Sequence, residues 1–486
     1  TLAAVIGFFV GAGGVQHAAG QEVSQAEEQW LLEEIVVTAT KRATSLQDTA
    51  LSVSAISGAD LSKLGATSYI NIMSSIPGVT LRELGPGQSP VILRGIGIGG
   101  SPALSVYIDD FPLAVGNLGT DIQLVDMAQI EVLKGPQGTL YGQSAMGGVM
   151  RFITNKPTTE RIEGGVTVSG EGVASGGNGY QAQGYVNIPV SDNVALRGVF
   201  YNYDKPGFID NLGTGTKDIN TEEVTGGRLA LRWDISERAV FDLLYLNQTQ
   251  RVGGGQAVNQ QTASSTYTPV LSGAPTDIGP PDLDNPSFRS NIDPYEERDF
   301  EVLNLKLGIS FENFDLTFMG ATKEQTRIDH WDLTPWLGLY DDVSFTGGNF
   351  ADVKFESNTF EGRLVSTGDG PLEWIAGVWY EKEDGDRNRH VTFQTPRVGF
   401  TLFGLADGDF LWDHDTFEDK EELSVYGEVG YRFSDQAKLT LGYRRADLKL
   451  DSGVTRADAL LDGAERAAIG VDESTQEDIN TYKIHF

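Results

Sequence analysis

Alternating hydrophobic and polar residues recur through the chain beyond residue 158. A period of two is the pattern of a β-strand with one apolar face. It predicts twelve strands, at 161–170, 179–189, 193–203, 223–234, 239–250, 298–310, 313–323, 353–366, 372–383, 421–433, 437–450 and 478–486. The links at 191–192, 235–238, 311–312, 367–371 and 434–436 are tight, whereas the others run longer, up to 251–297. Short turns on one side and long loops on the other are typical of a large antiparallel transmembrane β-barrel, and a soluble β-sandwich would not keep this parity.

Aromatic residues gather near the ends of these predicted strands. Such positions form the girdles that anchor a barrel at the two surfaces of outer-membrane lipid. We expect this role for Tyr201, Tyr203, Trp233, Tyr245, Trp374, Trp379, Tyr380, Tyr426, Tyr431, Phe433 and Tyr443.

The preceding part of the chain, residues 45–157, mixes short strands with short helices. The pattern predicts strands at 50–56, 91–94 and 105–110 and helices at 60–64 and 69–75, with Asp60 as the N-cap of the first helix. Pro77 and Gly78 end the second helix. This order predicts a small α+β domain of about 110 residues.

That domain ends in a glycine-rich stretch, DMAQIEVLKGPQGTLYGQSAMGGVMRFITNKP, from Asp126 to Pro157. Strands at 130–134 and 149–154 flank a turn at Gly135-Pro136. Between them lie Tyr141-Gly142 and Gly147-Gly148. So many glycines between two short strands predict a tightly folded backbone that packs against another part of the protein.

The pattern I-E-V-L-K-G-P…L-Y-G…G-G-V in this stretch resembles the end of the plug domain in TonB-dependent outer-membrane receptors. The resemblance implies a plug followed by a barrel. The residues that carry the plug motif are Gly95, Asp109, Asp110, Glu131, Gly135, Pro136, Tyr141, Gly142, Gly147 and Gly148. Asp109-Asp110 before Phe111-Pro112 favours a turn over a paired-carboxylate catalytic site.

Two basic residues are candidates for a lock between plug and barrel. In receptors of the family that this sequence resembles, basic residues at the positions of Arg94 and Lys134 pair with barrel glutamates. Lys134 stands where arginine is usual, which keeps the charge but loses the bidentate fork. The alternative is that both are surface charges on plug strands. If they do form the lock, we expect their carboxylate partners on strands that this chain lacks.

The size of a plugged barrel is the reason to expect that this chain lacks some strands. A plugged lumen goes with about 22 strands, so twelve strands would leave roughly ten missing. We therefore expect an open sheet with edges at 161–170 and 478–486. Tyr482, Ile484 and Phe486 only imitate the alternating signal that ends such barrels.

A β-branched stretch precedes the plug-like domain, at residues 33–40. An isolated strand with unpaired backbone groups is suited to edge pairing with another protein, although an ordinary first strand has the same pattern. In this position it resembles a TonB box, which implies binding to TonB and its inner-membrane energising complex. The residues involved would be Glu34, Ile35, Val36, Val37, Thr38, Ala39 and Thr40. We expect a signal-peptide remnant at 1–20, a linker at 21–44, a plug at 45–157 and a partial barrel at 158–486, with no room for an extra signalling domain.

Charge and composition exclude several classes of function. The net charge of −32 is opposite to the basic footprint that nucleic-acid binding needs, so we expect no nucleic-acid partner. We expect loops at the acidic stretches 341–342 and 381–384. There is no cysteine, and the five histidines show no metal-ligand spacing. The GxGxxG at 95–100 precedes another strand instead of a helix, and Ser144 lacks the final glycine of G-x-S-x-G. We therefore expect no cofactor, no metal and no enzyme.

These observations predict a receptor in the outer membrane of a Gram-negative bacterium that takes up a scarce, large ligand with energy from TonB. The resemblance makes a ferric siderophore the commonest assignment, with cobalamin, haem, glycans or plant-derived aromatics as alternatives. A passive porin or adhesin-like barrel is the other class. Trp331 and Trp336, with Phe345 and Phe350, would offer a stacking surface for the ligand in a loop after residue 323, or would simply pack.

Overall fold

The computed structural model describes residues 36–486 except 39, 43, 48–50, 74, 82–90, 99–100, 103, 114–121, 143–144, 255–285, 289, 291, 333–345, 369, 395–409, 435 and 459–468. Residues Val36–Phe486 form one compact unit. The expected signal remnant, most of the linker, and Glu34, Ile35, Ala39, Trp336 and Phe345 lie outside the described residues. None of the helices in the described part of the chain has the length and apolar character needed to cross a membrane.

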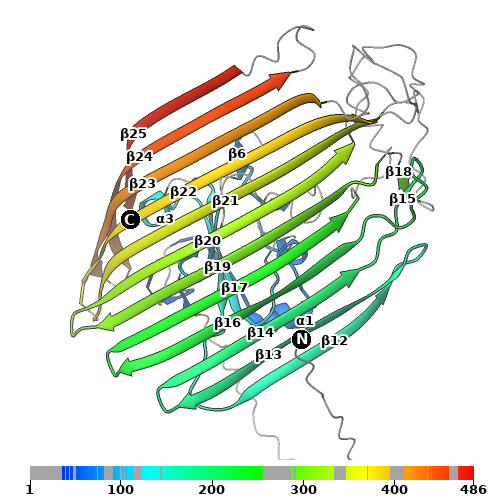
Figure 1. Cartoon of the computed structure of the whole chain (residues 1–486). Coiled ribbons are helices and arrows are strands. Elements are labelled where there is room, and N and C mark those ends of the chain that lie inside the picture. The colour runs from blue at the N-terminus through cyan, green and yellow to red at the C-terminus, as the bar shows by residue number, and fades with distance from the viewer. Residues whose placement is uncertain are drawn as a thin grey trace, which may run out of the picture. The chain divides into compact units, whose positions relative to one another are not determined.

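Twelve antiparallel strands form one sheet in which each strand pairs with its neighbour in the chain (Figure 1). They are β12 (Glu163–Gly172), β13 (Asn178–Ser191), β14 (Val194–Lys205), β16 (Glu222–Ser236), β17 (Ala239–Gly253), β19 (Tyr295–Ser310), β20 (Phe314–Asp332), β21 (Thr346–Ser366), β22 (Leu372–Gln394), β23 (Phe410–Ser434), β24 (Ala437–Asp458) and β25 (Ile469–His485). All twelve predicted strands are confirmed, and most extend further than predicted on the side of the long links. Two short strands in those links, β15 (Asp210–Asn211) and β18 (Ser287–Phe288), pair in parallel.

The sheet is open among the described residues. Strand β12 pairs only with β13, and β25 pairs only with β24. The two edge strands, β12 and β25, are therefore the ones that the sequence predicted. Residues 381–384 are a correction, because they lie inside β22 and not in a loop. Glu381 and Glu383 point to the inner face, where they are buried.

The outer face of the sheet carries an apolar belt close to the tight turns. Leu372 and Val378 on β22, and Phe360 on β21, are about half exposed. Further along the same outer face, β22 becomes charged at Lys382 and Asp386. An apolar band bounded by polar residues is the surface that a barrel presents to lipid.

Several of the predicted girdle aromatics face inward instead, which corrects that expectation. Tyr201, Tyr203, Trp379 and Tyr426 are buried on the inner face, at 4%, 1%, 6% and 5% exposure. Trp233, Tyr245, Tyr431, Phe433 and Tyr443 are exposed, as a girdle requires. Neighbouring residues of a strand face opposite sides, so nearness to a strand end does not decide which face an aromatic occupies.

The plug-like domain is built on a five-stranded sheet in the order β3-β10-β11-β8-β9. Its strands are β3 (Val53–Ser57), β8 (Leu104–Ile108), β9 (Phe111–Pro112), β10 (Met127–Lys134) and β11 (Gly148–Thr154). The other short pairs are β1 (Val36–Val37) with β2 (Thr44–Ser45), β4 (Val79–Leu81) with β5 (Val91–Leu93), and β6 (Gly97–Ile98) with β7 (Ser101–Pro102). The helices are α1 (Gly58–Leu64), α2 (Ile70–Met73) and α3 (Gly138–Tyr141). Mixed strands and helices are as predicted, and α3 is additional.

Helix α1 begins earlier than predicted. Its N-cap is Ser57, whose Oγ accepts a hydrogen bond from the Asp60 backbone N–H at 3.1 Å. Asp60 is therefore in the first turn, where its carboxylate accepts from the Ser57 hydroxyl at 2.8 Å and is favoured by the helix dipole. Gly65 ends the helix with φ of 62°.

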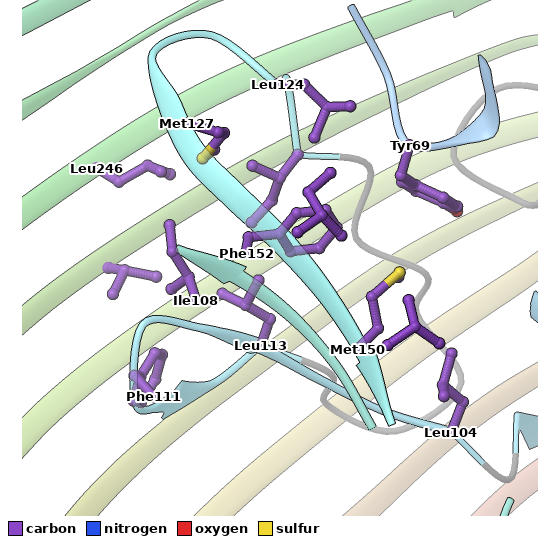
Figure 2. Packing of buried hydrophobic residues seen from close by; sticks show 14 of the residues in the cluster. Tyr69, Leu104, Ile108, Phe111, Leu113, Leu124, Met127, Met150, Phe152 and Leu246 are labelled. Carbon is purple, nitrogen blue, oxygen red and sulfur yellow. The ribbon is translucent and has the colours of Figure 1, made fainter. Parts of the chain in front are cut away.

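The plug core continues into the wall of the large sheet. Met127, Ile130 and Phe152 of the plug belong to one buried cluster with Leu246 of β17 and Met319 of β20. Figure 2 shows this cluster, with Leu246 and the plug residues projecting from separate elements. Each such side chain, once fully buried, stabilises the assembly by about 1.5–3 kcal/mol. The apolar contacts position the charged contacts described next.

Candidate functional site: a charge network between plug and wall

Asp110 is the centre of a buried charge network. It follows β8 in a turn in which Asp109 has φ of 53°, so the predicted turn is confirmed. The Asp110 carboxylate lies 3.2 Å from Arg151 of the plug, and 2.6 Å and 3.3 Å from Lys306 and Arg363 of the wall. One plug carboxylate therefore joins β11 of the plug to β19 and β21 of the large sheet.

The network continues on both sides of Asp110. Within the plug, Arg151 also pairs with Glu131 at 2.7 Å. Within the wall, Arg363 pairs with Glu361 at 3.0 Å. All four of these side chains are at most 6% exposed, so each charge depends on its partners for compensation.

Thr38, in the segment that resembles a TonB box, and Lys41, just after it, close the two ends of this network. The Thr38 backbone N–H donates to Glu131 at 2.7 Å, and Arg151 donates to the Thr38 hydroxyl at 2.7 Å. Lys41 pairs with Glu361 at 2.7 Å, and the Tyr426 hydroxyl donates to the same carboxylate. The N-terminal segment, the plug sheet and the wall thus share a single set of ion pairs.

This segment is not the unpaired edge strand that the sequence predicts. Val36 and Val37 pair with Thr44 and Ser45 in a short hairpin. Val37 is fully buried. The hairpin forms because the plug offers Val37 an apolar site, a tertiary contact that an alternation pattern does not contain.

Arg42 fixes the same segment to the wall. Its guanidinium donates to the backbone oxygen of Ser366 at 2.8 Å and to that of Trp374. Ser366 is the last residue of β21 and Trp374 lies near the start of β22, on either side of the tight turn that joins these strands. The segment therefore lies at the tight-turn side of the sheet.

Burial and neighbouring charges act in opposite directions on the pKa of Asp110 and on that of Lys41. Burial alone would raise the pKa of the Asp110 carboxyl, but the cations Lys306, Arg363 and Arg151 outweigh it and hold this pKa well below its usual range. Burial lowers the pKa of Lys41 to about 8, although the Glu361 carboxylate opposes that shift. Asp110 is therefore an anion under all physiological conditions.

The pKa of Asp110 predicts how stability depends on acid. A carboxyl whose pKa is depressed in the folded state stabilises the fold fully above its unfolded pKa of about 3.9, and this contribution is lost as the pH falls through the folded-state pKa. We expect the free energy of unfolding to fall below about pH 4, and to fall less in Asp110→Asn. Urea unfolding of both proteins between neutral and acid pH measures this. Parallel pH profiles would contradict it.

A second plug carboxylate, Asp126, forms a separate anchor. It lies between Leu124 and β10, with φ of 56°. Arg197 of β14 donates to its two oxygens at 2.6 and 2.8 Å, and Arg228 of β16 lies at 3.0 Å. A bidentate arginine–carboxylate pair fixes orientation as well as distance.

The residues predicted to form the lock lie elsewhere. Arg94 donates to the Ser52 hydroxyl at 3.1 Å in an exposed position, and Lys134 lies on the last position of β10. In the described part of the chain neither forms an ion pair with a carboxylate, so their role as a lock stays a prediction. The anchors centred on Asp110 and Asp126 have the opposite polarity, with the acid on the plug and the bases on the wall, whereas the Lys41–Glu361 pair has its acid on the wall.

Glycines of the plug motif allow the backbone to fold tightly beside the network. Gly135, Gly142 and Gly148 have φ of 106°, 80° and 152°. A Cβ on Gly148 would lie 2.2 Å from the Leu133 carbonyl oxygen. Beside Gly142, the carbonyl of Tyr141 accepts from the Tyr107 hydroxyl at 3.1 Å. Two further motif residues hold the same turn: Pro136 precedes α3, and the Gly147 carbonyl accepts from the Gly135 N–H at 2.9 Å.

Comparison with known proteins identifies this arrangement. The model of the TonB-dependent receptor plug domain matches residues 45–149. Residues 45–149 are therefore a plug domain of the TonB-dependent receptor kind. The architecture of the chain is thus a TonB-dependent receptor plug followed by strands of an outer-membrane barrel, in the outer membrane of a Gram-negative bacterium.

Sequence and structure comparisons show how much of each similar protein this chain covers. The pesticin receptor of Yersinia pestis is 28% identical over 267 residues, covering 52% of this chain and 38% of its own length. The ferrioxamine B receptor of Salmonella typhimurium (strain SL1344) is 26% identical over 436 residues, covering 84% of this chain and 56% of its own. The crystal structure of the ferric yersiniabactin uptake receptor FyuA from Yersinia pestis matches with a TM-score of 0.72 and 17% identity, over 90% of this chain and 62% of that one. The chain thus spans only part of the length of each.

The structure also shows where the other candidate motifs of the sequence lie. Gly97 and Ile98 of the GxGxxG stretch form β6, which pairs with β7, so no helix follows them. Among the described residues, no three histidine, aspartate or glutamate side chains are grouped so that they could hold a metal ion. Trp331 and Phe350 lie on strands β20 and β21, not in a loop as expected, and Phe350 stacks on His330 with ring centroids 3.9 Å apart.

Sequence reasoning missed Asp126, Lys41, Lys306 and Arg363 as anchors, and it assigned no charge role to Asp110. A signal was available, because Arg363 occupies an inward position of a predicted strand. An inward charge requires a partner. The sequence does not say which residue that partner is.

Proposed function

We propose that this TonB-dependent receptor imports a ferric siderophore across the outer membrane with energy from TonB and its inner-membrane complex. One observation carries the proposal. Thr38 and Lys41, within or next to the segment that TonB would bind, contact Glu131 and Glu361. The arginine partners of these two carboxylates, Arg151 and Arg363, both pair with Asp110. Tension on that segment therefore acts on the residues that hold the plug.

The order of events follows from the contacts. Pulling residues 34–40 from the periplasm withdraws Thr38 from Glu131 and Lys41 from Glu361. Removing a partner from a buried ion pair costs about 3–5 kcal/mol, because a charge remains without compensation. The loss weakens the hold of Arg151 and Arg363 on Asp110, and the plug is freed to rearrange.

The names of similar proteins support a ferric siderophore as the transported cargo. Proteins similar to this chain are named as receptors for ferrioxamine B and for ferripyoverdine. Cobalamin, haem and glycans are the alternatives within energised transport. A passive porin or adhesin-like barrel would not need a plug that is tied to the wall by buried charges, and an enzyme would need a reactive centre. We therefore place the protein among receptors.

Deleting the segment tests the proposal directly. In iron-starved cells that carry the full-length gene, removal of residues 35–40 should reduce energised uptake of ⁵⁵Fe-siderophore to the level of cells without TonB. Binding at the cell surface should persist, because the deletion leaves the outer half of the barrel intact. Unchanged uptake without residues 35–40 would show that transport is not energised through this segment.

A further inference from the structure

A band of arginines lies on the inner face of the sheet, on the side of the long links. It consists of Arg298, Arg327, Arg387 and Arg389, and we call it the arginine band. Arg298 is directly opposite Arg327 across β19 and β20. Val353 of β21 is opposite both Arg327 and Arg387, so these residues form one row across four strands.

The register and burial place this row on the inner face. Residues directly opposite one another in an antiparallel sheet point to the same side. Val353 is fully buried, whereas the neighbours of Arg387 along β22, Asp386 and Asn388, are exposed on the outer face. Arg389 occupies the next inward position of the same strand, opposite Ala351, which is buried.

The arginine band lies beyond the membrane belt. On β22 the outer face changes from apolar at Val378 to charged at Lys382. Arg387 is nine residues past Val378, which is about 30 Å further along a strand. The arginines thus face the space that opens toward the long links, on the side opposite the TonB-box-like segment.

Carboxylates near the band compensate only part of its charge. Arg327 pairs with Asp329 at 3.1 Å, and Arg298 pairs with Glu296. Within the described residues, Arg387 and Arg389 form no ion pair, and their Nε atoms are buried without a hydrogen-bond partner. The charges of Arg327 and Arg389 act on Arg387 as like charges. The Glu418 carboxylate also acts on Arg387, so four arginines against three carboxylates leave an excess positive charge inside a chain whose net charge is −32.

We propose that the arginine band recognises an anionic ferric chelate, one that presents carboxylate groups, in preference to a neutral or cationic hydroxamate complex. This inference rests on the proposed function. Guanidinium groups match carboxylates bidentately, and like-charged arginines held together are stabilised when an anion binds between them. A positive field inside an acidic protein also concentrates an anionic ligand at this face.

Binding to the full-length receptor in isolated outer membranes tests this specificity. The probes are ⁵⁵Fe-ferric citrate, an anionic polycarboxylate complex, and ⁵⁵Fe-ferrioxamine B, a cationic trihydroxamate complex. The variant is Arg387→Gln/Arg389→Gln. The matched control, Lys382→Gln/Arg445→Gln, removes two positive charges from exposed residues of the outer face.

We expect the wild type to bind ferric citrate more tightly than ferrioxamine B. Affinity for ferric citrate should fall about tenfold for each arginine removed, because each removal deletes a charge-assisted hydrogen bond to a carboxylate. Its dependence on salt should weaken in parallel, whereas the control should retain wild-type affinity. Retention of the salt dependence in a folded variant would overturn the assignment even if the affinity changed.

The outcomes separate this inference from the proposed function. Ferric citrate binding that is absent, or that is equal in wild type and the arginine variant, overturns the inference. If uptake of ferrioxamine B still requires residues 35–40 in that case, energised siderophore transport stands without the anionic preference. If uptake of neither chelate requires residues 35–40, both proposals fall.

Discussion

Asp110→Asn should release the plug from the wall. The substitution keeps the shape of the side chain but removes the charge that compensates Arg151, Lys306 and Arg363. Breaking a buried ion network by removing one partner costs about 3–5 kcal/mol. We expect a loss of this size in the free energy of urea unfolding of the plug, and greater entry of large hydrophilic antibiotics such as vancomycin into cells.

A carboxylate elsewhere in the plug provides the control. Asp60 pairs with Lys63 on the surface of α1, where both side chains are more than half exposed. Asp60→Asn removes the same charge from the same domain, and we expect little change in unfolding or antibiotic entry because exposed ion pairs contribute little. Equal behaviour of the two variants would show that the Asp110 network does not hold the plug.

Gly148→Ala should prevent the plug from reaching its native packing. The backbone of Gly148 has φ of 152°, a conformation that L side chains rarely adopt. An added Cβ would lie 2.2 Å from the Leu133 carbonyl oxygen and 2.4 Å from a methyl group of Leu93. Leu133 is on β10, the strand that pairs with β11, so relief of the clash would require separating the two central strands of the plug.

We expect Gly148→Ala to destabilise the plug by more than about 4 kcal/mol, since backbone strain and core overpacking act at one position. Limited proteolysis of membranes would detect this as rapid cleavage within residues 45–157. Gly470→Ala is the control, because a Cβ there would contact nothing within 4 Å and its φ is not positive. Resistance of the Gly148 variant to protease would show that the strands accommodate the methyl group.

These predictions distinguish two kinds of contribution to holding the plug. Apolar contacts such as those among Met127, Leu246 and Met319 supply most of the favourable free energy. The ion pairs are costly to desolvate, so their contribution is mainly orientation. A plug that must move during transport is suited to such a division, because ion pairs can exchange partners while apolar surfaces slide.

The sequence by itself determined the strands and their order. Alternation is a local property, since a strand such as β14 repeats its two faces every second residue whatever it packs against. The parity of short and long links, and the glycines of residues 135–148, are local in the same way. These features sufficed for a small α+β domain followed by antiparallel barrel strands, and the resemblance of residues 126–157 to a known family added the plug. They also placed the turn at Asp109-Asp110.

Only the tertiary structure decided which residues meet. Asp110 lies 196 positions from Lys306 and 253 from Arg363, and no periodic pattern links them. The polarity of the anchors, the burial of Val37 and the inward direction of Tyr201 all depend on which surface of the plug faces which strand. That choice is made by shape and by the cost of leaving a charge buried alone, and both become defined only when the elements pack together.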